Sequence, residues 1–322
     1  MAGSKKGGAK APVKGLLLLE WVMIAYAVGT LLLVFLMQTM LHDTSAMIVL
    51  RVQAVAIVLA LWGVYRMVPC RLTLFIRVMA QVALLQQWYS ETFEFNRMQP
   101  NLDHIFAGWE QSLFGFQPAL LFSEKLSHPI FSELLTLGYV SYYPLMLIVP
   151  LYYLFYRYNE FPKASFVMLA SFFLFYVIFI FLPVAGPQYY YLAAGIDSIR
   201  EGIFPNIGTY FETHTGCLPI PGYQNGLMYK LLVFAHQSGE RPTAAFPSSH
   251  VGIIVVLLWL VRATKNRRLF WSLVPFGVLM FFATFYIRAH YAIDALAGLA
   301  AGTVMYFLFT GLYHLCSGKN RV

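Results

Sequence analysis

Long apolar runs, each bounded by short polar or charged segments, make up most of the chain. A helix that crosses a bilayer needs about 20 mostly apolar residues, because the hydrocarbon core is about 30 Å thick. By this criterion we expect an all-α fold, a polytopic integral membrane helix bundle. The pattern predicts about eight spans, within a range of six to eight, at residues 15–40, 45–66, 70–90, 133–157, 163–185, 249–263, 269–288 and 290–314.

Charged and amide side chains interrupt the predicted spans at a few positions. Arg77 and three glutamines lie within the third span, and the sixth span is short because Arg262 marks its end. Glu20 and Arg51 lie inside the first two spans, where contact with lipid would be costly. We therefore expect these two residues to face protein or to lie near the lipid headgroups.

The composition is that of a membrane protein. Hydrophobic residues make up 59% of the chain and charged residues 11%, whereas soluble domains carry about 25% charged residues. The net charge of +8 does not indicate nucleic acid, because most Lys and Arg fall in the termini and the short inner loops if the N-terminus is inside. We therefore expect cytoplasmic termini. The three cysteines form no CxxC pair, so we expect no metal and no cofactor.

Two long outer loops, at about 92–130 and 186–247, divide the predicted bundle. Irregular backbone cannot face lipid with its polar groups unsatisfied, so we expect both loops to lie at the interface and to roof a site. The site would face the periplasm, the cell exterior or a lumen. We expect one integral membrane domain over residues 1–322, with early spans at 15–90 and a catalytic bundle at roughly 133–314. A GxxxG pair, Gly298 and Gly302, favours close helix packing within this bundle.

Two polar motifs stand at the starts of apolar segments, forty residues apart. The first is Phe246–His250 (FPSSH) and the second is His290–Asp294 (HYAID). The helices between them run inward and back, so both motifs reach the same outer face. His290 and Asp294 are i and i+4 on a helix and share one side of it, where the carboxylate can hold one imidazole nitrogen and leave the other basic. This pattern indicates nucleophilic and acid–base chemistry on a phosphate; the alternative is two interfacial histidines that cap helices.

The pair of motifs resembles the type-2 phosphatidic acid phosphatase superfamily, mainly over residues 183–302. The resemblance implies that His290 attacks phosphorus and becomes a phosphohistidine. It also implies that His250 protonates the leaving oxygen and that Asp294 orients the nucleophile.

The sequence departs from the phosphatase branch of that family at the phosphate-binding positions. Ala283 and Thr284 stand where the branch has Ser-Arg, and its early Lys-x6-Arg-Pro motif has no match upstream of FPSSH. Arg241 with Pro242 supplies only a displaced Arg-Pro. We expect other outer-face cations and the helix start to bind substrate, namely Arg288, Arg241, Lys230, Ser248 and Ser249.

The segment Pro183–Tyr191 (PVAGPQYYY) is more similar to the inositol phosphorylceramide synthase branch, and so, more weakly, is the loop from Leu102 to Gly115. This resemblance implies a transferase of sphingolipid metabolism that moves a phosphoinositol-type head group to a lipid alcohol. Two alternatives stay open. One is a lipid phosphate phosphatase of the phosphatidate or polyprenyl phosphate type, which releases phosphate to water. The other is a non-enzymatic membrane transporter or scaffold. The expected partners are lipid substrates and the bilayer.

Overall fold

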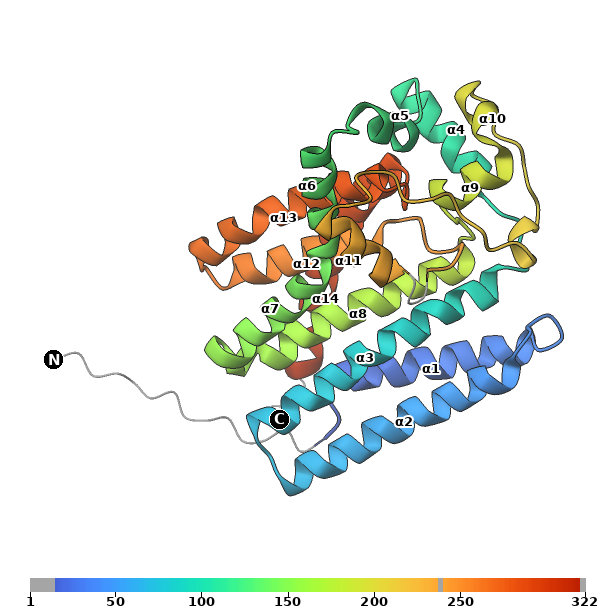
Figure 1. Ribbon diagram of the computed structural model, residues 1–322. Helices are drawn as coiled ribbons and strands as arrows, with labels where there is room; N and C mark the ends of the chain where they lie inside the picture. The colour runs from blue at the N-terminus through green and yellow to red at the C-terminus, as the bar shows by residue number, and fades with distance from the viewer. Residues whose placement is uncertain (1–14, 237–239, 319–322) are drawn as a thin grey trace.

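The computed structural model describes residues 15–236 and 240–318, and every regular element in this part of the chain is a helix (Figure 1). The predicted all-α bundle is therefore confirmed, and each predicted span corresponds to a helix or helix pair. These are α1 (Leu18–Leu36), α2 (Thr44–Met67), α3 (Arg71–Asn96), α6 (Pro129–Val140) with α7 (Tyr142–Tyr156), α8 (Phe161–Phe181), α12 (Ser249–Ala263), α13 (Arg267–Tyr286) and α14 (Ala292–Gly318).

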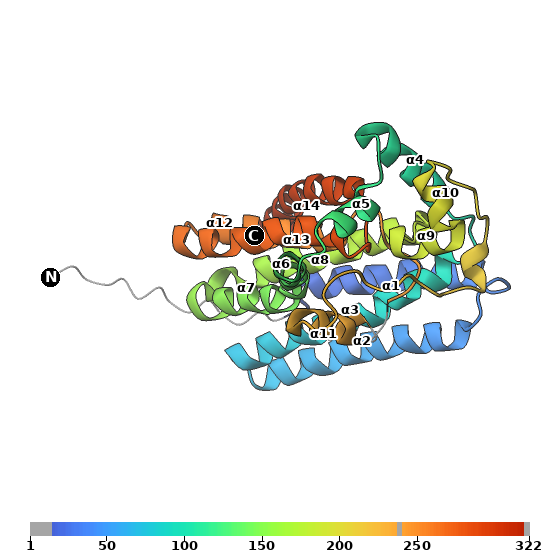
Figure 2. The same ribbon diagram turned by 45° about the horizontal axis from the view of Figure 1, so that its top comes forward.

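The long loops also contain helices. They are α4 (Asp103–Phe114) and α5 (Pro118–Lys125) in the first loop, and α9 (Pro187–Ala194), α10 (Ile196–Arg200) and α11 (Leu227–His236) in the second, with short 3-10 turns η1 (Tyr158–Glu160) and η2 (Tyr210–Glu212). Four of them, α4, α5, α9 and α10, gather beyond one end of the long helices (Figures 1 and 2). We call these four the roof helices. They lie at the end where α12 and α14 begin.

Fewer helices qualify as membrane spans than the sequence pattern predicted. Five of the described helices are long and apolar enough to cross a bilayer: α1, α2, α8 with its preceding turn, α13 and α14. The pair α6 and α7, bent by 43°, makes a sixth if it counts as one span. Polar residues exclude α3, and α12 is too short at 15 residues. Up to six spans therefore qualify by this criterion, which is the lower end of the predicted range of six to eight.

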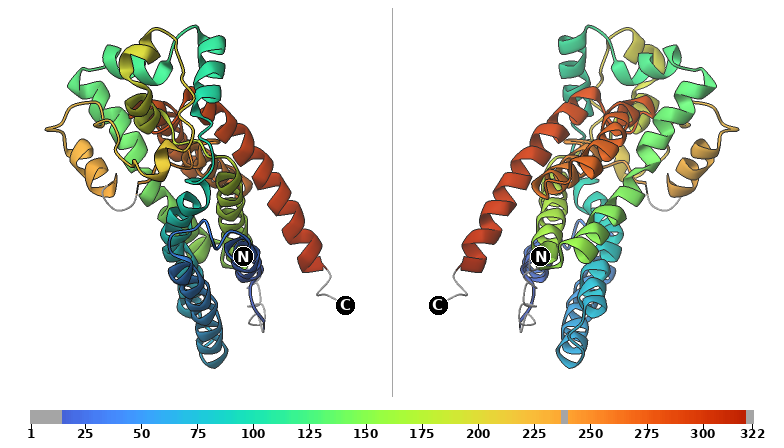
Figure 3. Two further views of the ribbon diagram at one scale, coloured as in Figure 1. Left: turned by 90° about the vertical axis from the view of Figure 1, so that its right-hand side faces the viewer. Right: turned by 90° about the vertical axis from the view of Figure 1, so that its left-hand side faces the viewer.

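The long helices form two groups that share α8. On one side α1, α2, α3 and α8 lie side by side, and on the other α12, α13 and α14 pack together (Figures 1 and 3). α8 contacts α1 and α3 in the first group and α12 and α14 in the second, and it is the most buried of the spans. α3 and α12 thus pack against qualifying spans although they fail the test themselves.

Charged residues inside the helices are paired within the bundle. Arg77 Nη2 lies 2.6 Å from Glu20 Oε2, and both side chains are buried. Arg51 Nη2 lies 2.9 Å from Glu91 Oε2. The expectation that Glu20 and Arg51 face protein is confirmed. Pairing also explains how an arginine is accommodated in the middle of α3, because an unpaired charge there would be costly.

α12 and α14 approach each other at backbone distance. A Cβ atom added to Gly298 would lie 2.4 Å from the backbone oxygen of Ser248, and one added to Gly302 would lie 2.2 Å from that of Gly252. These atoms can move away only if the helices separate, so the GxxxG pair permits close packing, as predicted. The contact fixes the start of α12, which carries His250, against the first turns of α14.

We expect Gly302→Ala to destabilise the protein by about 1–3 kcal/mol, the usual cost of overpacking a core. The measurement is the thermal unfolding midpoint of the detergent-solubilised protein. Gly311→Ala is the matched control, because a Cβ at this position of the same helix meets nothing within 4 Å. Equal midpoints for the two variants would show that the α12–α14 contact tolerates an added methyl group.

Candidate active site

The two histidines of the motifs meet at the roofed end of the bundle. His250 is the second residue of α12, whose N-cap Ser248 accepts a hydrogen bond from Val251 N at 3.4 Å. His290 lies in the turn between α13 and α14. Their ring centroids are 5.7 Å apart and the ring planes are inclined by 66°. The structure therefore brings together two side chains that are forty residues apart in the sequence.

Backbone groups hold the His290 ring and its loop. The ring Nδ1 is 2.7 Å from the carbonyl oxygen of Ala245, and the backbone N–H of His290 donates to Thr284 O at 3.1 Å. A carbonyl can only accept, so Nδ1 must carry the proton and donate. Because a neutral imidazole has one N–H, Nε2 then keeps a free lone pair.

Asp294 lies beside the His290 ring and does not hold it by a hydrogen bond. Its Oδ2 atom is 3.7 Å from His290 Nδ1, beyond hydrogen-bond distance. The same oxygen accepts a hydrogen bond from the backbone N–H of Tyr291 at 2.8 Å. The orienting contact that the sequence assigned to this carboxylate is thus made by the Ala245 carbonyl, with the carboxylate close enough to act through its charge.

Burial keeps the His290 ring uncharged. Its side chain is 5% exposed, and burial lowers its pKa from 6.5 to about 4, although the hydrogen bond to Ala245 acts in the opposite direction. An unprotonated Nε2 is therefore present at neutral pH, as a nucleophile requires.

Tyrosines flank His250 on the side of α6 and α7. The ring centroids of Tyr139 and Tyr142 lie 4.7 Å and 4.6 Å from that of His250, and the bend between the two helices falls between these residues. A cavity of about 20 Å³ adjoins both histidines, which is room for about one water molecule. Its other lining residues include Tyr89, Gln188, Tyr189, Arg241, Thr243 and Ser249.

Two of the five predicted substrate-binding residues, Arg241 and Ser249, line this cavity. Arg241 is exposed and Ser249 is buried. Ser248 is fully buried and has a structural part: its hydroxyl caps α12, and its backbone N–H donates to Asp294 O at 3.0 Å. This last bond ties the first motif directly to the second.

The other two predicted residues lie away from the cavity. Arg288 Nη2 donates to Ser123 Oγ at 3.1 Å, so its side chain extends toward α5. Lys230 is exposed on α11. Neither residue lines the cavity between the histidines.

Asp103, to which the sequence gave no role, connects the roof to the second motif. Its Oδ1 accepts hydrogen bonds from Gly186 N at 2.8 Å and from the Tyr291 hydroxyl at 3.0 Å. Its Oδ2 accepts from Ala185 N at 2.6 Å and from Asn101 Nδ2 at 2.5 Å. One buried carboxylate thus joins the start of α4, the start of α9 and the turn before α14.

The same backbone continues to the His290 ring. Ala245 N donates to Val184 O at 3.0 Å, and Ala245 O accepts from the His290 ring. Gly186 has a φ of +92°, and a Cβ there would lie 2.5 Å from the backbone oxygen of Ala289. Only glycine therefore fits at position 186, where the backbone passes close to the turn that carries His290.

Glu110 is a second buried acid on α4. Its Oε2 accepts a hydrogen bond from Ile293 N at 3.3 Å, at the first turn of α14. Burial and then repulsion by Asp294 raise its pKa to about 8. Asp103 and Glu110 lie seven residues apart, on the buried side of α4 that also includes Phe106. Acidic residues on the apolar side of an amphipathic helix are the sequence signal that would have found both.

Comparison with known proteins identifies the family. The model of the PAP2 superfamily matches residues 104–308, a range that includes both motifs and the roof helices apart from the first residue of α4. Over 67 residues the chain is 34% identical to undecaprenyl-diphosphatase BcrC of Bacillus subtilis (strain 168), a match that covers 20% of this chain and 34% of that protein. The match thus spans about a third of that relative's length. No solved structure matches the chain.

Protonation of His290 should destabilise the fold. Its pKa falls from 6.5 to about 4 on burial, so the unfolded chain takes up the proton first and stability decreases as the pH falls from 6.5 to 4. The shift corresponds to about 3 kcal/mol. Thermal unfolding from about pH 7.5 to 4.5 should therefore depend less on pH in His290→Gln than in the unaltered protein. His42→Gln, at an exposed site, should keep the full dependence, and identical pH profiles for all three proteins would contradict this account.

Replacing Asp103 should loosen the roof. Asp103→Asn keeps the size of the side chain but removes the charge and presents an amide group to four donors. Each hydrogen bond to a charged group contributes about 1.5–3 kcal/mol, so we expect a clearly lower unfolding midpoint. Asp197→Asn, where the side chain is 95% exposed, is the control. A variant at 103 as stable as the one at 197 would show that the network carries little free energy.

Proposed function

Because the chain belongs to the PAP2 superfamily, we propose that it is a membrane enzyme that cleaves lipid phosphoesters through a covalent phosphohistidine. One observation carries the proposal. The His290 and His250 rings lie 5.7 Å apart, and a carbonyl occupies Nδ1 of His290 so that Nε2 is left for attack. A capping role alone gives no reason for two imidazoles to converge on one cavity.

In the first step, Nε2 of His290 attacks phosphorus and the bond from phosphorus to the leaving oxygen breaks. His250 gives its proton to that oxygen, so the leaving group departs without gaining a negative charge. Arg241 and Ser249, which line the cavity, are placed to stabilise charge on the non-bridging oxygens. The Asp294 carboxylate, 3.7 Å from Nδ1, stabilises the positive charge that the nucleophilic ring acquires.

In the second step, the now neutral His250 takes a proton from an incoming hydroxyl group. The oxygen of that group attacks the phosphohistidine, the P–N bond breaks, and both histidines return to their starting state. Water as the acceptor gives a phosphatase, and a lipid alcohol gives a transferase. The same catalytic groups serve both outcomes.

We favour water as the acceptor and a lipid phosphate or diphosphate as the substrate. The relative with the 67-residue match is named an undecaprenyl-diphosphatase. The cavity of about 20 Å³ beside the two rings also suits a water molecule. On this proposal the site lies on the non-cytoplasmic face of the membrane.

Head-group transfer to a lipid alcohol is the second candidate. It is supported by the segment Pro183–Tyr191, whose resemblance is to the inositol phosphorylceramide synthase branch. In the structure this segment supplies Ala185 and Gly186, the two backbone donors to Asp103. These residues therefore position Asp103 in either reaction, and their presence does not distinguish the two. The acceptor has to be identified by experiment.

Incubation of the purified protein with a radiolabelled lipid phosphate should give an acid-labile phosphoprotein. His290→Gln should form none and should lose about 10⁴-fold or more in turnover, because it removes the nucleophile. His250→Gln should lose about 10²–10⁴-fold in turnover, because the first step then lacks its acid and the second its base. His42→Gln is the control for histidine replacement at an exposed position.

The acceptor is identified in the same assay. Adding a diacylglycerol or ceramide should leave free phosphate as the product if water is the acceptor, whereas a labelled lipid product would establish transfer. Turnover that survives in His290→Gln would refute the covalent mechanism and favour another nucleophile or the non-enzymatic alternative.

A further inference from the structure

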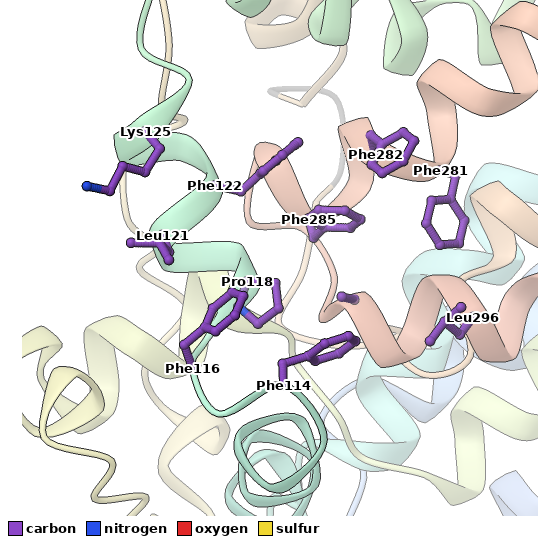
Figure 4. Close-up of a pocket in the computed structure, with 11 residues that line it drawn as sticks. Phe114, Phe116, Pro118, Leu121, Phe122, Lys125, Phe281, Phe282, Phe285 and Leu296 are labelled. Carbon is purple, nitrogen blue, oxygen red and sulfur yellow. The ribbon is translucent and has the colours of Figure 1, made fainter.

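An apolar groove lies between the roof helix α5 on one side and the end of α13 and the start of α14 on the other (Figure 4). Its volume is about 430 Å³. Phe122 on α5 faces Phe285 and Phe282 on α13, with ring centroids 5.1 Å and 6.2 Å apart. Leu296 on α14 contributes to the opposite wall (Figure 4). The groove is separate from the histidine cavity, with which it shares no lining residue.

The groove continues along the helices. A second apolar cavity of about 330 Å³ shares Phe281, Phe282 and Leu296 with it and extends to Val274. The path from Phe285 to Val274 covers about 16 Å along α13 at 1.5 Å per residue. This elongated shape, parallel to the spanning helices, suits a hydrocarbon chain.

The helix α4, whose last residue Phe114 lines the groove, has an apolar and exposed face. Ile105, Trp109 and Leu113 are exposed at i, i+4 and i+8 on this helix, and Phe116 follows them. A continuous exposed stripe of large apolar residues at the end of a membrane bundle is typical of a helix that lies in the bilayer interface. A ligand of the groove therefore reaches it from the membrane.

The roofed end of the groove is positively charged. Lys125, at the end of α5, extends away from the phenylalanine rings (Figure 4). Arg288 binds Ser123 on the same helix, and its Nε is buried without a hydrogen-bond partner. The neighbouring acid, Glu124, is paired with Arg200 at 2.9 Å. Among the described residues, Lys125 forms no ion pair, so its ammonium group is available to an anionic head group at this end of the groove.

We propose that this groove binds an anionic phospholipid, with one acyl chain along α13 and the phosphate group at Lys125. Phe285 and Ala292 line the groove on either side of the turn that carries His290. The bound chain therefore packs against both ends of the catalytic turn without entering the histidine cavity. The proposal concerns binding and does not depend on the reaction that the histidines perform.

Photocrosslinking tests the site directly. The full-length protein is reconstituted in phosphatidylcholine vesicles with a trace of phosphatidic acid that carries a diazirine on one acyl chain. Illumination should label peptides of α13 and α14 that line the groove, and unlabelled phosphatidic acid should compete. Lys125→Glu should reduce labelling by more than about fivefold, because it removes one cation, which contributes about fivefold near an anionic lipid, and also adds an anion. Leu296→Trp, which fills the groove, should abolish it.

Matched variants serve as controls. Leu308→Trp places the same ring at an exposed position lower on α14, and Lys163→Glu reverses a charge at the start of α8; both should label normally. If Leu296→Trp fails to fold, as judged by its unfolding midpoint, Ala292→Phe fills the roofed end of the same groove and replaces it. Undiminished labelling in the folded groove variant would overturn the proposal. Competition by diacylglycerol as strong as by phosphatidic acid would also overturn it, because the contact would then be ordinary exposure to the bilayer.

Discussion

The carboxylate of Asp103 is the contact on which the geometry of the site depends. It is fully buried and accepts hydrogen bonds from the backbone of Ala185 and Gly186 and from the hydroxyl of Tyr291. A buried charge is tolerated when its oxygens are saturated by donors, and here the donors come from two distant segments and from the neighbouring Asn101. The satisfied carboxylate therefore sets the position of the backbone that leads, through Ala245, to the His290 ring.

A second constraint comes from helix packing in the membrane. Gly298 allows the backbone of Ser248 to touch α14, and the Ser248 N–H then reaches Asp294 O. The two polar motifs are thus joined by main-chain atoms before any catalytic side chain is considered. This explains how His250 and His290 converge although they belong to different helices. Small residues at the contact and polar groups at the helix start are both required.

The sequence was sufficient for the helices and for the two histidines, because apolar runs and helix starts are local properties. It was insufficient where the partner is distant. Asp294 was expected to orient His290 from the i, i+4 spacing and the family resemblance. In the structure the carbonyl of Ala245 accepts the hydrogen bond from the His290 ring, and no local sequence pattern predicts such a contact with a backbone carbonyl. Arg288 was predicted to bind phosphate because it lies on the same face of the membrane as the two histidines. The orientation of its side chain, however, is set by a hydrogen bond to Ser123, which is distant in the sequence. Asp103 lies in a loop to which the sequence gave only a weak resemblance, because its main donors lie in other segments.

On the proposed mechanism, burial and catalysis depend on the same atoms of the site. Removing water from His290 lowers its pKa and keeps Nε2 unprotonated, while the carbonyl on Nδ1 fixes which nitrogen is free. The phosphohistidine of the proposed mechanism would be an imidazolium-like cation in the same buried place, and the Asp294 carboxylate, 3.7 Å from Nδ1, would offset part of its charge. The acid therefore matters more after attack than before it. The Asp294 carboxylate lies 3.7 Å from His290 Nδ1 and forms no hydrogen bond with it. On the proposed mechanism its contribution is therefore electrostatic, and the stabilisation increases as the bond between phosphorus and Nε2 forms.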